Sequence, residues 1–312
     1  MAIHQGACQA GCPILECGGM SGQTRVNKKA NAVTGGGRLP ASKIGVDGKF
    51  ARGDLHSGVD SESGSGTSIF DPVLCELIYR WFCPPNGLVL DPFAGGSVRG
   101  IVASKLGRDY VGIDLRPEQV DANRAQADRI CDDHKPRWIV GDSRDIATLA
   151  LDEYDLIFSC PPYFDLEVYS EDQRDLSTME WEPFLEQYRW IIAQSCAMLR
   201  SGRFACFVVG DMRDERGFYR NFPAETIAAF QAAGMTLYNE AILVTAVGSL
   251  PIRIGKQFGS YRKLGKTHQN VLVFWRGDPK SISDILGETE FGELPMPDPD
   301  PDNLLKPKLL NS

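Results

Sequence analysis

The chain has 312 residues, of which 43% are hydrophobic and 24% are charged, and its formal net charge is −8. This composition is ordinary for a folded globular protein, and the negative charge excludes a protein that coats nucleic acid through its overall charge. No apolar run reaches the roughly 18 residues of a membrane span, and the first residues lack the basic and apolar regions of a secretory signal. We therefore expect a cytoplasmic protein with no membrane partner.

Residues 1–66 are rich in Gly, Ser, Asn and Lys and show no apolar periodicity, so they predict a flexible basic arm. Within it, His4, Cys8, Cys12 and Cys17 lack the paired spacing and matched second half of a zinc site, and we predict no metal site. The nine cysteines of the chain lie at uneven spacing, several of them in apolar runs. This pattern predicts reduced thiols rather than a disulfide framework.

Apolar residues at helical spacing begin at Phe70, and strands and helices alternate from there. Asp71 and Pro72 supply an N-cap and a first-turn proline for the first helix. Near-continuous apolar strands separated by helices predict an α/β fold, a doubly wound parallel sheet covered on both faces. The seven strands are expected at 87–93, 110–115, 137–142, 154–160, 203–211, 235–245 and 270–275, and the later helices at 97–107, 116–134, 183–199 and 224–233.

The last two strands have no helix predicted between them, so we expect the final strand to be antiparallel and residues 246–269 to form a long loop. Residues 241–277 contain no acid. Clustered cations neutralise backbone phosphates, so this basic loop is the predicted DNA-recognition segment, with a solvated hairpin as the alternative. The candidate DNA-binding residues are Arg253, Lys256, Arg262, Lys263 and Lys266. Residues 278–312, rich in Asp and Pro, predict an acidic disordered tail, which leaves 67–277 as the folded domain.

Acids and glycines mark the carboxyl ends of the first three strands, where doubly wound sheets bind their ligands. The first strand ends in "DPFAGGS" (91–97), whose glycines allow close backbone approach at a helix N-terminus. Asp114 ends the second strand as an acceptor for a ribose diol, and Asp142 ends the third as an acceptor for an adenine amino group. Together they predict a pocket for an adenosine-bearing cofactor, and the absence of a G-x-G-x-x-G fingerprint disfavours a nicotinamide dinucleotide.

The fourth strand ends in "CPPYF" (160–164). Two consecutive prolines remove two backbone donors and make a rigid bend that offers carbonyl acceptors only. Tyr163 adds an aromatic face beside them.

In "DPFAGGS", "GIDL", "GDSRD" and "CPPYF", taken in this order, the chain resembles the S-adenosylmethionine-dependent DNA amino-methyltransferases, the N6-adenine/N4-cytosine group, over residues 70–277. The resemblance implies a seven-stranded Rossmann-like methyltransferase sheet and a site-specific enzyme acting on double-stranded DNA. The oligomeric state stays open between a monomer and a homodimer. It implies S-adenosylmethionine as cofactor and a base site at Cys160, Pro161, Pro162 and Tyr163. The implied cofactor contacts are Asp91, Phe93, Gly95, Asp114 and Asp142.

The sequence departs from that family at Cys160, because Asp, Asn or Ser usually precedes the two prolines and sulfur is a weak acceptor. The target base therefore stays open between adenine N6, which the family as a whole favours, and cytosine N4. Three alternatives remain: covalent carbon-5 methylation by Cys160, an amino-methyltransferase acting on RNA or protein, and a catalytically weak DNA-binding protein of this fold.

Overall fold

The computed structural model describes residues 2–4, 70–132, 134–164, 168–245 and 250–288. Most of the predicted basic arm, including Cys8, Cys12 and Cys17, lies outside the described residues, as does the tail beyond residue 288. The loop residues Asp165 and Glu167 lie outside them as well.

The described strands form one eight-stranded sheet in the order β1-β7-β8-β6-β5-β2-β3-β4. Strand β8 runs antiparallel to both of its neighbours, β6 and β7, as predicted for the last strand. Without the short edge strand β1, the order is that of the seven-stranded methyltransferase sheet, and the predicted fold class is confirmed. The strands span Ala2–His4 (β1), Leu88–Asp91 (β2), Asp109–Asp114 (β3), Arg137–Val140 (β4), Tyr154–Ser159 (β5), Leu199–Val209 (β6), Thr236–Val244 (β7) and His268–Arg276 (β8).

The helices connect these strands and cover both faces of the sheet. Asp71 caps the first of them by accepting hydrogen bonds from the backbone N–H groups of Val73 and Leu74. The α-helices span Pro72–Phe82 (α4), Val98–Lys105 (α5), Pro117–Ile130 (α6), Ile146–Leu149 (α7), Trp181–Ala197 (α8), Phe222–Ala232 (α9), Leu250–Tyr261 (α10) and Ile282–Leu286 (α11). Three 3-10 turns lie at Ser143–Asp145 (η3), Leu176–Thr178 (η4) and Pro279–Ser281 (η5).

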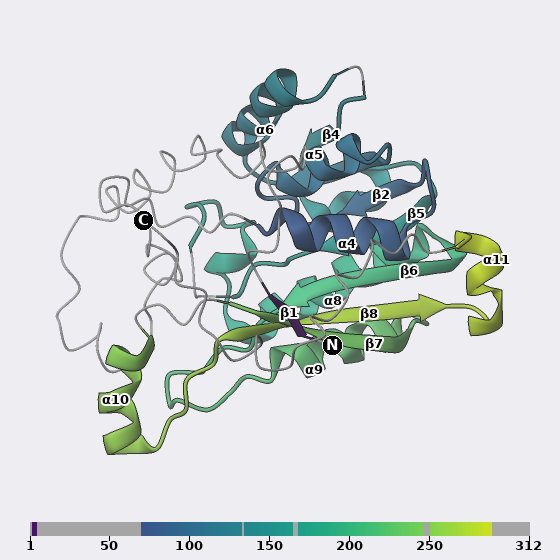
Figure 1. Cartoon of the computed structure of the whole chain (residues 1–312). Helices are drawn as coiled ribbons and strands as arrows, with labels where there is room; N and C mark the ends of the chain where they lie inside the picture. Colours follow the sequence, from purple (N-terminus) through teal and green to yellow (C-terminus); the bar gives the residue numbers. More distant parts are fainter. Residues whose placement is uncertain (1, 5–69, 133, 165–167, 246–249, 289–312) are drawn as a thin grey trace, which may run out of the picture.

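Two apolar cores lie on opposite faces of the sheet. Helices α4, α5 and α6 pack on one face, and α7, α8 and α9 pack on the other (Figure 1). Strand β5 is buried at every position, as its near-continuous apolar sequence predicts for a central strand. The six described cysteines are all free thiols.

The strands β2, β3, β4, β5 and β6 pair in parallel. Their carboxyl ends therefore meet along one edge of the sheet.

Three segments differ from the expectations. The connection between β7 and β8 contains helix α10, although no helix was expected there; Pro251 is tolerated because it lies in the first turn. Helix α11 follows the predicted boundary at residue 277, and its Ile282 and Ile285 pack against the core, so the folded part extends beyond that boundary. Strand β1 pairs in parallel with β7 at the edge of the sheet. It was not expected, because its apolar run is too short to predict a strand.

Candidate active site

Asp91, at the end of β2, is fully buried and joins three other elements. Its Oδ2 atom accepts hydrogen bonds from Arg99 Nε at 2.6 Å and from the Tyr110 hydroxyl at 2.7 Å. Its Oδ1 atom accepts from the Ser159 hydroxyl at 2.5 Å and from the backbone N–H of Phe93 at 3.1 Å. Burial of a carboxylate is tolerated because these four donors replace water. Asp91 thereby fastens the end of β5 to the glycine-rich turn after β2.

The glycine-rich turn is held to the next strand by Asp114. Gly95 adopts a φ of +50°, and its N–H donates to Asp114 Oδ2 at 3.0 Å. Asn123 of α6 donates to the Gly95 carbonyl at 2.8 Å. A Cβ at Gly95 would meet no atom within 4 Å, so the turn has open space beside it at the start of α5. An open backbone turn next to a carboxylate acceptor fits a ribose and an amino acid moiety.

Asp142 follows β4 and caps η3, where its side chain accepts from the backbone N–H of Arg144 and from the Arg144 guanidinium. Burial raises the pKa of Asp142, but these hydrogen bonds outweigh burial and hold the pKa below its usual value. The neighbouring Ser143 hydroxyl donates to the Pro92 carbonyl at 2.5 Å. Hydrogen bonds thus join the ends of β2, β3, β4 and β5 along one edge of the sheet, and we call this edge the crevice.

The bend after β5 lies beside this crevice, because Ser159 precedes it directly. Cys160 Sγ lies 3.7 Å from the Tyr163 hydroxyl. The Tyr163 side chain is 8% exposed, its hydroxyl lies 3.5 Å from the Val208 carbonyl, and Gln269 Nε2 donates to it. The bend is therefore anchored to both β6 and β8.

Aromatic rings support the bend from below. Phe164 has a φ of +48°, in the left-handed region that non-glycine residues rarely adopt. Its ring packs edge-on against Trp181 and Phe184 of α8, with centroids 5.3 Å and 5.4 Å away. The Tyr163 ring meets Phe222 of α9 at 6.4 Å. The position of the bend is consequently fixed by the core beneath it.

The predicted DNA-binding residues are only partly described. The side chains of Arg253 and Lys256 lie outside the described residues. Arg262 directly follows α10 with a φ of +55°, and its guanidinium donates to the carbonyls of Phe258 and Gly259. Lys263 and Lys266 come next in the chain. Both lie beside residues 217–219, which belong to a hairpin that follows β6.

The predicted cofactor residues lie along the same crevice, but their side chains differ in exposure. Asp114 retains 13% side-chain exposure, whereas Asp91 retains none. The Phe93 ring packs against the rings of Tyr188 and Phe207, with centroids 6.0 Å and 6.3 Å away. The sequence gives only a weak signal for the residues that hold the crevice together. Arg99 is a cation in the first turn of a mostly apolar helix, and the others are Tyr110, Asn123, Ser159 and Gln269.

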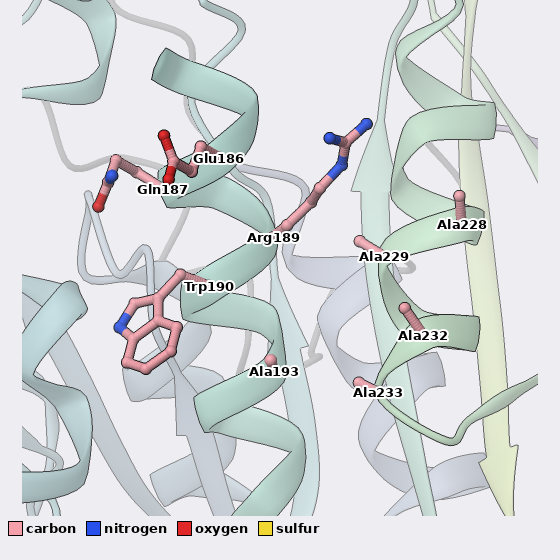
Figure 2. A pocket seen from close by; sticks show the side chains of 9 residues that line it. All are labelled: Glu186, Gln187, Arg189, Trp190, Ala193, Ala228, Ala229, Ala232 and Ala233. Atoms are coloured by element: carbon pink, nitrogen blue, oxygen red, sulfur yellow. The ribbon is translucent and has the colours of Figure 1, made fainter. Parts of the chain in front are cut away.

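A separate groove lies between α8 and α9, lined largely by small side chains (Figure 2). Polar side chains reach it only from the α8 side (Figure 2). It shares no residue with the crevice, so it contributes nothing to the predicted site. Its lining residues are Glu186, Gln187, Arg189, Trp190, Ala193, Ala228, Ala229, Ala232 and Ala233.

The sheet order and the crevice define the class of S-adenosylmethionine-dependent methyltransferase folds. Residues 67–125, which carry the glycine-rich turn and Asp114, match the N6/N4 family described as DNA methylase. The predicted resemblance to that family is confirmed over this segment.

Two type II methyltransferases are similar to parts of the chain. M1.MboII of Moraxella bovis is 48% identical over 48 residues, 15% of this chain and 18% of that protein. M.SmaI of Serratia marcescens is 34% identical over 79 residues, 25% of this chain and 27% of that protein. The chain thus matches less than a third of the length of either relative. Among solved structures, TrmN from Thermus thermophilus is 18% identical with a TM-score of 0.44, covering 66% of this chain and 49% of that one.

The described residues include no helix long and apolar enough to cross a membrane.

Asp114 gives the crevice a pH dependence that can be measured. Burial raises its pKa to about 6, although Arg116 and the backbone donors act in the opposite direction. Because this exceeds the unfolded value of about 3.9, the protonated form favours the fold below pH ~4, and this contribution is lost as the pH rises through 6. The affinity of a ligand that needs the Asp114 carboxylate as a hydrogen-bond acceptor has the opposite pH dependence, because protonation removes that acceptor. We expect calorimetry to show S-adenosylmethionine affinity constant above pH ~7 and falling about tenfold per pH unit below 6.

Asp114→Asn is the matched control, since it keeps the size of the side chain and removes the titration. We expect weaker binding with a flat pH profile between pH 5 and 8. An unchanged slope in this variant would show that another group titrates.

Proposed function

We propose that the chain transfers a methyl group from S-adenosylmethionine to the exocyclic amine of a base in DNA, adenine N6 in preference to cytosine N4. The observation that carries this proposal is the hydrogen bond between Ser159 and Asp91, which couples the donor-free bend to the glycine-rich turn. The DNA methylase family match over residues 67–125 supports the same substrate class.

The cofactor is held, in this proposal, by the turn around Gly95, by Asp114 as acceptor for the ribose hydroxyls and by Asp142 near the adenine. Asp91 and Phe93 act differently: Asp91 positions the turn through Arg99 and Ser159, and Phe93 supplies an apolar wall. When bound, S-adenosylmethionine supplies an electrophilic methyl group on a sulfonium.

The target amine is a poor nucleophile because its lone pair is delocalised into the ring. Acceptors that hold its hydrogens, among them the Pro161 carbonyl, favour the pyramidal form in which charge develops on nitrogen. Prolines at 161 and 162 present no N–H that would oppose this charge. The base must leave the duplex to reach this bend, and the Tyr163 ring offers a stacking surface.

A methyl-transfer assay tests the proposal. The full chain is incubated with S-adenosylmethionine carrying a radiolabelled methyl group and with duplex DNA, RNA or protein offered separately. We expect label in duplex DNA, and hydrolysis to nucleosides should yield N6-methyladenine or N4-methylcytosine. Label confined to RNA or protein would contradict the proposal.

Cys160 distinguishes direct amine attack from covalent catalysis. In the proposed mechanism the thiol is only a weak acceptor, so Cys160→Ala should leave kcat within about threefold of the original value. Cys160→Asn adds an amide acceptor, and we expect kcat to rise roughly tenfold, which corresponds to one hydrogen bond of about 1.4 kcal/mol. Loss of all transfer in Cys160→Ala, with 5-methylcytosine as the original product, would instead identify Cys160 as a covalent nucleophile.

A further inference from the structure

The hairpin formed by residues 211–221 leaves the carboxyl end of β6 and presents aromatic and cationic side chains to solvent. Arg213 and Tyr219 pair across it. Asp214 closes its turn by donating from its N–H to the Phe218 carbonyl and accepting from the Phe218 N–H, both at 2.8 Å. At the tip, Phe218 is 62% exposed although its backbone is fixed. An aromatic ring held in solvent on an ordered turn is suited to a contact with another molecule.

The base of this hairpin packs directly on the proposed base site. Asp211 Oδ1 accepts hydrogen bonds from the N–H groups of Met212 and Phe222, and the Phe222 ring meets that of Tyr163. The Arg220 guanidinium lies 4.7 Å from the ring centroids of both Phe164 and Trp181. The base of the hairpin therefore adjoins the residues proposed to hold the extruded base, and the tip extends from there.

The hairpin also contacts the predicted DNA-binding segment, so that cations surround its aromatic rings. Arg213 lies 3.7 Å from the centroid of the Tyr219 ring, and Lys266 lies 5.7 Å from the same ring. Arg216 lies 5.3 Å from the ring of Phe218, and Lys263 reaches Gly217. The acids of the hairpin are Asp211 and Asp214, both engaged in hydrogen bonds to backbone N–H groups, and Glu215. Cations interleaved with exposed rings are typical of nucleic-acid contacts, in which the cations bind phosphates and the rings stack on bases.

We propose that this hairpin enters the opened DNA duplex beside the extruded base, where Phe218 stacks on the neighbouring base and Arg216 contacts a backbone phosphate. The inference rests on the proposed function. Extrusion leaves an unstacked gap in the duplex, and an inserted apolar side chain fills such a gap. Phe218 acts only once the base has left the stack, whereas Arg216 acts in every encounter with DNA.

Two variants separate these roles. For Phe218→Ala we expect kcat/KM for methyl transfer to duplex DNA to fall at least tenfold, with little change in affinity for a fluorescently labelled duplex of mixed sequence. Phe218→Trp should restore transfer because it retains a stacking ring. For Arg216→Gln we expect the slope of log affinity against log salt concentration to decrease by about 0.9, the effect of one lost phosphate contact.

Tyr238→Ala and Arg129→Gln are the matched controls, since both side chains are exposed and lie outside the hairpin and the crevice. Melting curves confirm that each variant is folded. If the wild-type protein methylates DNA while Phe218→Ala keeps its kcat/KM and Arg216→Gln keeps its salt slope, the hairpin proposal is overturned and the proposed function stands. If the wild-type protein transfers no methyl group to DNA, the proposed function fails, and this inference fails with it.

Discussion

Replacing Arg99 by methionine is expected to lower the free energy of unfolding by about 3–5 kcal/mol, because it leaves the carboxylate of Asp91 buried without its cation. Both side chains are nearly inaccessible to water, with 5% and 0% exposure. The guanidinium also donates to the carbonyls of Phe93 and Ala94 at 2.8 Å and 2.9 Å. Urea unfolding followed by circular dichroism measures the loss, and the m-value should stay constant.

Arg189→Met provides the control for this change. Arg189 pairs with Glu225 on the surface, with side-chain exposures of 49% and 31%, and surface ion pairs contribute little. We expect its loss to cost less than about 1 kcal/mol. The double variant Arg99→Met/Asp91→Leu should be less destabilised than the sum of the two single variants, because no unpaired charge remains. A loss below about 1 kcal/mol for Arg99→Met would contradict the role assigned to this pair.

Arg99→Met has a second expected consequence in the crevice. Without its hydrogen bonds to Phe93 and Ala94, the glycine-rich turn loses its fixed position beside Asp114. Affinity for S-adenosylmethionine should therefore fall even where the variant remains folded. An Arg99→Lys variant keeps the charge but not the planar fork of donors, so it should recover stability better than it recovers cofactor affinity.

The sheet could be predicted from the sequence because its central strands satisfy several rules at once. Residues 154–159 are largely apolar and are followed after Cys160 by a proline pair, and every position of β5 is buried. Helix α10 could not be predicted, because it contains Pro251, Gly255 and Gly259, which are typical of a loop. Strand β1 has three residues, too few for a periodic signal.

The sequence predicts that the candidate site lies at a set of strand ends, but it does not predict which of the acids there is buried and which is exposed. Asp91 and Asp114 both end a strand before a helix, and nothing in the sequence distinguishes them. Their exposure differs because Arg99, Tyr110 and Ser159 converge on Asp91, and these come from three separate elements. The hairpin at residues 211–221 escaped prediction for a similar reason: its cations are interrupted by Asp214 and Glu215, so no basic run marks it.

Tyr163 is the residue whose loss is expected to reduce methyl transfer most strongly. Stacking of one base on an aromatic ring contributes about 1–3 kcal/mol, so Tyr163→Ala should lower kcat/KM for duplex DNA by roughly a hundredfold. The variant also removes the hydroxyl that accepts a hydrogen bond from Gln269 of β8. Steady-state kinetics with radiolabelled S-adenosylmethionine measures the effect, and S-adenosylmethionine affinity should change little because Tyr163 lies outside the turn around Gly95.

Tyr163→Phe and Gln269→Leu separate the ring from its anchoring hydroxyl. Tyr163→Phe keeps the stacking surface and loses the contacts to Gln269 and to the Val208 carbonyl, so we expect a loss of no more than about tenfold, the worth of one hydrogen bond. Gln269→Leu should resemble it, and combining the two should add little, because both remove the same contact. Equal, near-complete inactivation by Tyr163→Ala and Tyr163→Phe would show that the hydroxyl, and not the ring, acts on the base.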